Sequence, residues 1–178
     1  GLLDVAGSSI ALGSGSFNSG SLTFNSAGSV TISEDSSLDL VGVNTAGSAD
    51  IDSVVAVSDS AATSVTVTSL LDVSGTSIVL GSGATVFNAG TLTFNSAGSV
   101  TISEGSSLDL VGINTADSTD LDSSVGVSDA GAASVTVTGL LDVSGTSIAL
   151  GSGATVFNTG TLTFNSAGSV TISEDSSL

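Results

Sequence analysis

The chain has 178 residues and carries 17 Asp and Glu residues but no Lys, Arg or His, which gives a formal net charge of −17 at pH 7. Cys, Met, Pro, Trp and Tyr are also absent. A protein without cationic side chains cannot neutralise phosphate, so nucleic-acid binding is excluded. The lack of His and Cys excludes the usual zinc, haem and iron–sulfur sites, together with the catalytic triads that depend on these residues.

The remaining residues are apolar enough to form a buried core. Mean hydropathy is +0.56 and 40% of the residues are hydrophobic, whereas disordered chains combine high net charge with low hydrophobicity. No run approaches 18 consecutive apolar residues, so we expect no membrane insertion. The sequence shows no signal peptide. It starts and stops within a repeating pattern, so we expect it to be a piece of a longer or processed polypeptide.

Near-identical segments recur at regular intervals along the chain. The tetrapeptide Leu-Leu-Asp-Val at 2–5 returns at 70–73 and again at 140–143. Segments 69–108 and 139–178 differ at only four of 40 positions. A fixed period, here close to seventy, is typical of repeat architectures. We therefore interpret 1–178 as a single array of three copies, 1–68, 69–138 and a partial copy, 139–178.

Short strands fill each copy. In Leu92-Thr93-Phe94 and Val100-Thr101-Ile102 apolar residues alternate with Thr, and this period of two is typical of a strand with one buried face. Gly, Ser, Asn and Asp separate the strands, and Gly and Asn tolerate the positive φ that tight turns require. The spacing predicts three coils per copy, at 91–112, 113–139 and 140–160.

Two all-β architectures compete for such strands: a closed sandwich and a β-solenoid. A sandwich of about 100 residues has no reason to repeat itself within its own length, whereas a solenoid requires coils that pack on copies of themselves. We predict a right-handed parallel β-helix with about three coils per 70-residue repeat. Eight coils at about 4.8 Å each would form a rod about 38 Å long, with equivalent acids about 14 Å apart along its axis.

Every Phe in the chain is followed by Asn. We expect Phe to fill the core and Asn to cap a tight corner, in the left-handed conformation that Asn tolerates better than most residues. The six Phe residues are Phe17, Phe24, Phe87, Phe94, Phe157 and Phe164.

Acidic residues are the candidates for ligand binding. Carboxylate oxygens suit hard cations such as Ca²⁺, although neither the EF-hand pattern nor the Gly-rich nonapeptide repeat occurs. The alternative is a solvated coat that keeps the protein soluble. The chain offers no Trp, Tyr or cationic side chain to hold a sugar between paired carboxylates, so we expect no enzymatic activity and no cofactor other than Ca²⁺. The candidate Ca²⁺ ligands are Asp50, Asp52, Asp117, Asp120 and Asp122.

The run Thr-Leu-Thr-Phe-Asn-Ser-Ala-Gly-Ser-Val-Thr-Ile-Ser-Glu at 91–104 resembles the tandem repeats of giant bacterial surface and secreted proteins of the filamentous-haemagglutinin-like type. The resemblance extends over the whole chain. It implies a secreted right-handed β-helix that serves as an adhesin stalk, a surface fibre or a matrix. The secretion domain and the capping segment of that family are not seen in this sequence.

Together these observations predict a structural protein at the bacterial cell surface or outside the cell. We expect a filament, stalk or matrix of stacked coils that self-associates end to end or continues covalently. The alternative is an adhesin module that binds Ca²⁺ or a glycan.

Overall fold

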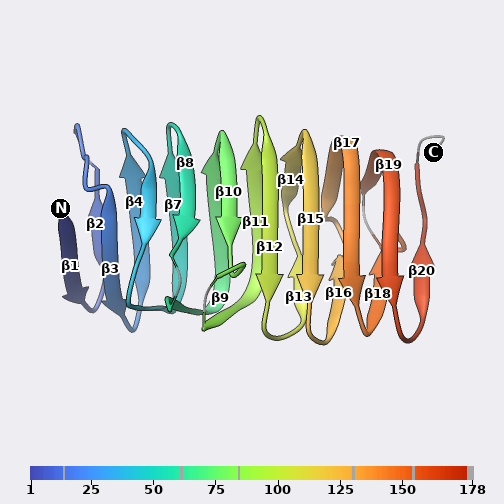
Figure 1. Ribbon diagram of the computed structural model, residues 1–178, viewed down its shortest axis with the longest axis horizontal. Helices are drawn as coiled ribbons and strands as arrows, with labels where there is room; N and C mark the ends of the chain where they lie inside the picture. The colour runs from blue at the N-terminus through green and yellow to red at the C-terminus, as the bar shows by residue number, and fades with distance from the viewer. Residues whose placement is uncertain (14, 61, 84, 130, 154, 176–178) are drawn as a thin grey trace.

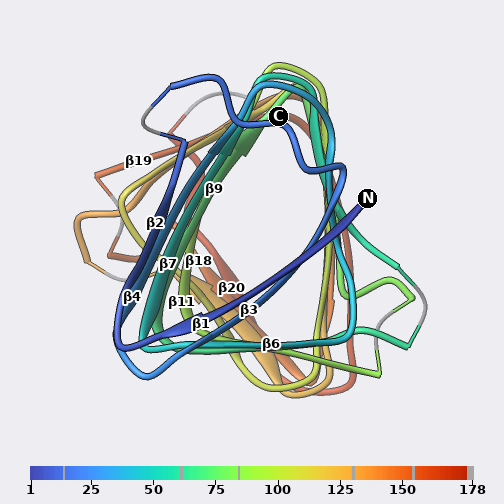
Figure 2. The same ribbon diagram turned by 90° about the vertical axis from the view of Figure 1, so that its left-hand side faces the viewer.

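The computed structural model describes residues 1–13, 15–60, 62–83, 85–129, 131–153 and 155–175. Its 20 strands are parallel and stack as a β-solenoid of about eight turns (Figure 1). Seen from the N-terminal end, the chain runs clockwise around a roughly triangular outline as it recedes, so the β-helix is right-handed (Figure 2). The predicted fold class is confirmed. The described residues include no helix that could span a membrane.

Most strands are short, and four long strands turn a corner of the coil without a break. β9 pairs through its first half with β6 and through its second half with β7, and β11, β17 and β19 are built in the same way. The strands are β1 (Leu2–Gly7), β2 (Ile10–Leu12), β3 (Ser21–Ser26), β4 (Ser29–Glu34), β5 (Leu38–Leu40), β6 (Val43–Ala46), β7 (Ser48–Ser53), β8 (Ala56–Asp59), β9 (Ser64–Gly75), β10 (Ser77–Leu80), β11 (Val86–Ser96), β12 (Ser99–Glu104), β13 (Leu108–Leu110), β14 (Ile113–Ala116), β15 (Ser118–Ser123), β16 (Gly126–Asp129), β17 (Ser134–Gly145), β18 (Ser147–Leu150), β19 (Val156–Ser166) and β20 (Val170–Ile172).

The core is a set of apolar columns that run along the rod. Ile32, Ile51, Val73 and Phe94 stack in register in four successive coils, and all four are fully buried. Burying one such side chain stabilises the fold by about 1.5–3 kcal/mol. Their strand neighbours alternate outward, which places Ser, Thr and Asp on the surface. The expected role of Phe is confirmed for the four buried Phe residues, Phe24, Phe87, Phe94 and Phe157.

The coils are shorter than the sequence spacing predicts. Ser21, Asp39, Ser58, Val79 and Thr101 stack one above the other, so four coils separate Ser21 from Thr101. A 70-residue copy therefore makes about three and a half coils rather than three, and its coils are on average shorter than those predicted at 91–112, 113–139 and 140–160. The prediction was wrong because β9 and β11 run through corners of one or two residues that no turn motif marks.

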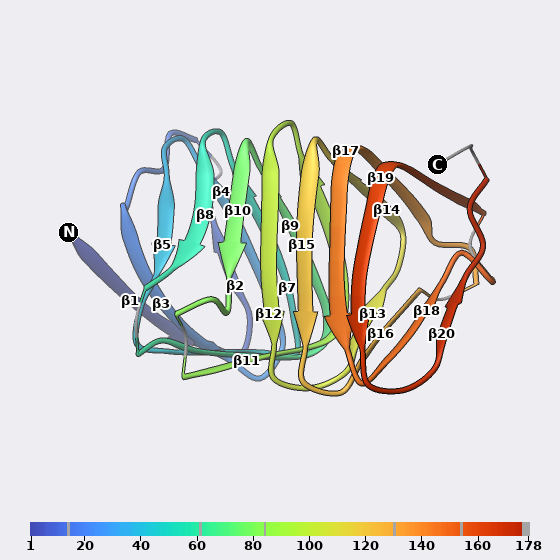
Figure 3. The same cartoon turned by 45° about the vertical axis from the view of Figure 1, so that its right-hand side comes forward.

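Because a copy makes about three and a half coils, successive copies are turned by about half a coil around the rod. The segments that bulge out before β9 and β11 project to one side, and those before β17 and β19 project to the opposite side (Figure 2). β12, β15, β17 and β19 then lie side by side along one face (Figure 3).

The prediction for Asn was wrong. Five of the six Asn residues that follow Phe lie within strands, and the only non-Gly residues with positive φ in the described chain are Ala62 and Ala132. An inward Phe forces the next strand residue outward, so Asn25 is exposed. The buried amide is Asn44, which accepts a hydrogen bond from the Phe24 amide (3.0 Å) and donates one to the Val41 carbonyl (3.0 Å).

Candidate functional site

The structure brings four of the five candidate Ca²⁺ ligands into stacked clusters of carboxylates. Asp50 of β7 lies in register with Asp72 of β9, and Asp120 of β15 lies in register with Asp142 of β17. Each set also includes the Asp two residues further along the first strand, on the same face. We call these sets the acidic bands: Asp50, Asp52 and Asp72 in the first copy, and Asp120, Asp122 and Asp142 in the second.

Sequence reasoning missed Asp72 and Asp142. Both belong to the recurring Leu-Leu-Asp-Val tetrapeptide, which was used only to measure the period. The members of each stacked pair, such as Asp50 and Asp72, lie one coil apart in the chain. A correct coil length is the signal that would have paired them.

Carboxylates in the bands are harder to ionise than free ones. Partial burial raises the pKa of Asp72, and the charges of Asp50 and Asp52 raise it further. Burial and the Asp52 charge likewise raise the pKa of Asp50. For Asp120 the causes of the raised pKa are burial, then Asp122 and Asp142. The chain has no Lys, Arg or His to offset this repulsion, so the bands attract cations and repel one another.

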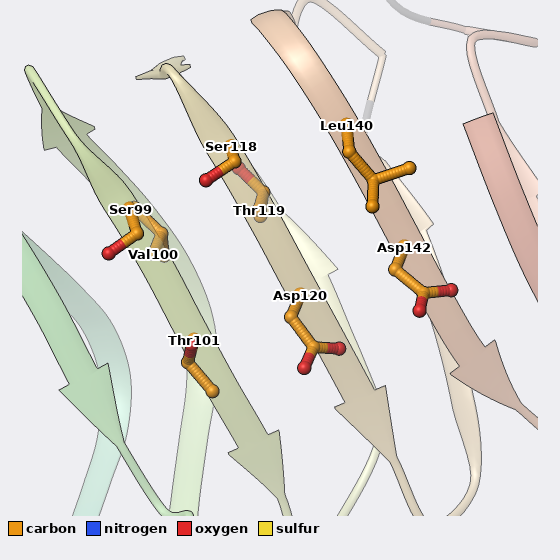
Figure 4. Close-up of a pocket in the computed structure, with 8 residues that line it drawn as sticks. All are labelled: Ser99, Val100, Thr101, Ser118, Thr119, Asp120, Leu140 and Asp142. Carbon is orange, nitrogen blue, oxygen red and sulfur yellow. The ribbon is translucent and has the colours of Figure 1, made fainter. Parts of the chain in front are cut away.

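Hydroxyl groups from neighbouring coils hold the carboxylates in place. Ser74 donates a hydrogen bond to Asp52, and Ser144 donates one to Asp122. Thr163 Oγ1 donates to Asp142 Oδ1 at 2.7 Å. Figure 4 shows the Asp120 and Asp142 side chains next to each other on adjacent strands. They border a hollow in the surface that is also lined by Ser99, Val100, Thr101, Ser118, Thr119 and Leu140.

Asp117, the fifth candidate, lies apart from the acidic bands. It is exposed at the corner between β14 and β15, where Thr138 Oγ1 donates a hydrogen bond to its Oδ1 (3.0 Å). Within the described residues no three carboxylates lie close enough together to hold a metal ion. Calcium binding by these residues stays a prediction.

Equivalent acids do not stack three coils apart, as the sequence spacing suggested. The Asp50–Asp72 pair and the Asp120–Asp142 pair are separated by one copy, and they therefore lie on opposite sides of the rod. Three and a half coils correspond to about 17 Å along the axis. This separation exceeds the Debye length of about 8 Å at physiological salt, so the two bands repel each other only weakly.

Two further carboxylates lie inside the coil and hold its corners. Glu34 accepts hydrogen bonds from the Ser19 amide at 3.3 and 3.0 Å. Glu104 accepts them from the Ala89 amide at 3.2 and 3.1 Å and from Ser106 Oγ at 2.7 Å. Burial raises the pKa of Glu104 although these bonds oppose the shift. The amide bonds join segments that are distant in sequence, which gives these Glu residues a structural role.

Asp59 and Asp129 form a second buried pair of equivalent acids. Asp59 Oδ2 accepts a hydrogen bond from the Gly81 amide (2.7 Å), and Asp129 Oδ2 accepts one from the Gly151 amide (2.6 Å). Neither Oδ1 atom has a hydrogen-bond partner among the described residues. Burial raises the pKa of both carboxyls, and each amide bond lowers it by a smaller amount.

Fold and surface together define a right-handed parallel β-helix whose polar clusters recur once in each copy. No family model, no curated protein and no solved structure matches this chain.

Proposed function

We propose that this protein is a structural element of an extracellular filament, stalk or matrix, made by a bacterium and built by stacking β-solenoid coils. The resemblance of segment 91–104 to filamentous-haemagglutinin-like repeats supports this location and role. No catalytic activity forms part of the proposal.

The observation that carries the proposal is that each copy stacks on the next through the same contacts. The register that joins Asp50 to Asp72 joins Asp120 to Asp142 one copy later, and the pairing of Asn44 with Val65 returns as that of Asn114 with Val135. A further copy therefore adds length without requiring any new kind of contact.

Growth along the axis follows from the same geometry. The outer edge of a parallel coil presents backbone N–H and C=O groups that pair with another strand. In the proposed filament these edges are paired either by further coils of the same polypeptide or by a second copy stacked head to tail. The head-to-tail contact does not close on itself, so it would produce an open fibre.

Electron microscopy of a chain that contains several added 70-residue copies would test this function. We expect straight rods of constant width in buffer without divalent cations, and antibody labelling at the surface of intact cells that produce the native protein. Compact particles, or labelling confined to the cell interior, would contradict the proposal.

The alternative function, a Ca²⁺-binding adhesin module, is favoured by one observation, the stacking of carboxylates without cationic partners in the acidic bands. Calorimetric titration with CaCl₂ distinguishes the two functions. Saturable binding that D120N/D142N abolishes would support the adhesin module, whereas weak binding without saturation fits the structural role.

A further inference from the structure

One side of each copy carries no carboxylate over three successive coils. In the first copy, Val43, Ser64 and Val86 stack in one outward row, and Thr45, Thr66 and Asn88 stack in the next. The second copy has the equivalent rows. We call these sets the neutral bands: Val43, Thr45, Ser64, Thr66, Val86 and Asn88 in the first copy, and Ile113, Thr115, Ser134, Thr136, Val156 and Asn158 in the second.

Each neutral band exposes a large aliphatic side chain. Val43 is 60% exposed and Ile113 is 67% exposed, although neighbouring apolar residues in the same strands are buried. Beside them lie Thr hydroxyl groups, which both donate and accept hydrogen bonds. The backbone groups of these strands are already paired within the ladder, so a partner would contact the side chains.

The half-coil offset between copies places the two neutral bands on opposite sides of the rod. The first band follows the bulge before β9, and the second follows the bulge before β17, which projects the other way (Figure 2). One rod therefore presents the same type of surface in two opposite directions.

We infer that the neutral bands are docking surfaces for a second copy of this chain, which pairs the rods side by side. Two chains of charge −17 without cations repel each other wherever carboxylates face carboxylates. The neutral bands are the surfaces where this repulsion is weakest and where aliphatic and hydroxyl groups meet their own kind. A band that faces its own copy forms a self-complementary contact. With a band on each of two sides, rods associate into a flat layer.

Asp117 makes the two bands unequal. It replaces the Gly47 of the first copy and lines the same hollow as Thr136 and Thr138 of the second. Docking through the second band therefore brings two Asp117 carboxylates towards each other. We expect D117G, which restores the residue of the first copy, to strengthen lateral association.

The test places one carboxylate in each band of the 178-residue chain and measures the rod cross-section by X-ray scattering and its mass by sedimentation. The wild type is expected to form layers of more than two rods as concentration rises. V43D leaves one band and stops at pairs. V43D/I113D leaves none, and its lateral association constant falls by at least about tenfold, because aliphatic burial is lost and charge is added.

V54D/V125D is the matched control, because it adds the same charge at exposed Val residues (66% and 49%) that lie outside the bands. It should associate like the wild type, and circular dichroism should show all variants folded. Wild-type rods that remain single at every concentration, or a control that dissociates as V43D/I113D does, would overturn the inference. Filament length is a separate measurement, so rods that lengthen without pairing would refute lateral docking and leave the proposed function intact.

Discussion

Asp50 and Asp72 lie directly above one another in adjacent coils, with no cationic side chain anywhere in the chain to separate their charges. The second copy repeats this relationship between Asp120 and Asp142. Folding therefore brings like charges together, which is the reverse of the ion pairing that stabilises many proteins near neutral pH.

The first prediction is that moderate acidification stabilises this protein. Burial raises the pKa of six carboxyls above the ordinary values of 3.8 for Asp and 4.5 for Glu. Between the ordinary and raised pKa values the folded chain binds more protons than the unfolded chain, so the free energy of unfolding falls as pH rises. Urea unfolding at about pH 7 and pH 5 should give the higher midpoint at pH 5. A lower midpoint at pH 5 would contradict the role assigned to these acids.

The second prediction concerns the stacked pair itself. D72N removes one of two facing charges and should raise the free energy of unfolding at pH 7 by about 0.5–1 kcal/mol. D4N is the matched control, because Asp4 occupies the same position in its tetrapeptide but faces Thr23. The benefit of D72N should shrink as pH falls and Asp72 becomes protonated. An equal effect of both variants at pH 7 would show that the stacking of Asp50 on Asp72 is unimportant.

The third prediction separates buried from exposed Asn residues. Asn44 is completely buried, and its side chain completes the hydrogen bonds of Phe24 and Val41. N44A leaves both backbone groups without partners and should cost about 2–3 kcal/mol in urea unfolding. N25A removes only a bond with Thr45 at the surface and should change stability by less than about 0.5 kcal/mol. Similar losses for the two variants would contradict the buried bridging role.

The fourth prediction uses a difference between the copies. Thr119 is buried, and its hydroxyl has no hydrogen-bond partner among the described residues, whereas the first copy has Ala49 in this position. T119V keeps the shape and removes the unpaired hydroxyl, so it should stabilise the protein by about 1 kcal/mol. A49T should have the opposite effect. Calorimetric melting of both variants checks this pair, and a destabilised T119V would show that the hydroxyl is satisfied.

Repetition and period-two alternation were sufficient to predict the fold, because they report directly on coils that stack with one buried face. Coil length was not predictable, since the corner at Gly90 lies inside β11 and resembles ordinary strand. The same error hid the Asp50–Asp72 contact, which depends on which residue lies one coil above another. Asn25 and Asn44 were confused for a related reason, because residue type alone does not reveal whether a strand position points inward.

The most direct test of the stacked-rod account is to lengthen the chain by one 70-residue copy and compare both chains by small-angle X-ray scattering. Three and a half coils should add about 17 Å to the rod. The cross-sectional radius of single rods should not change. A longer chain that is wider, or that grows evenly in all directions as a globular protein does, would contradict the account.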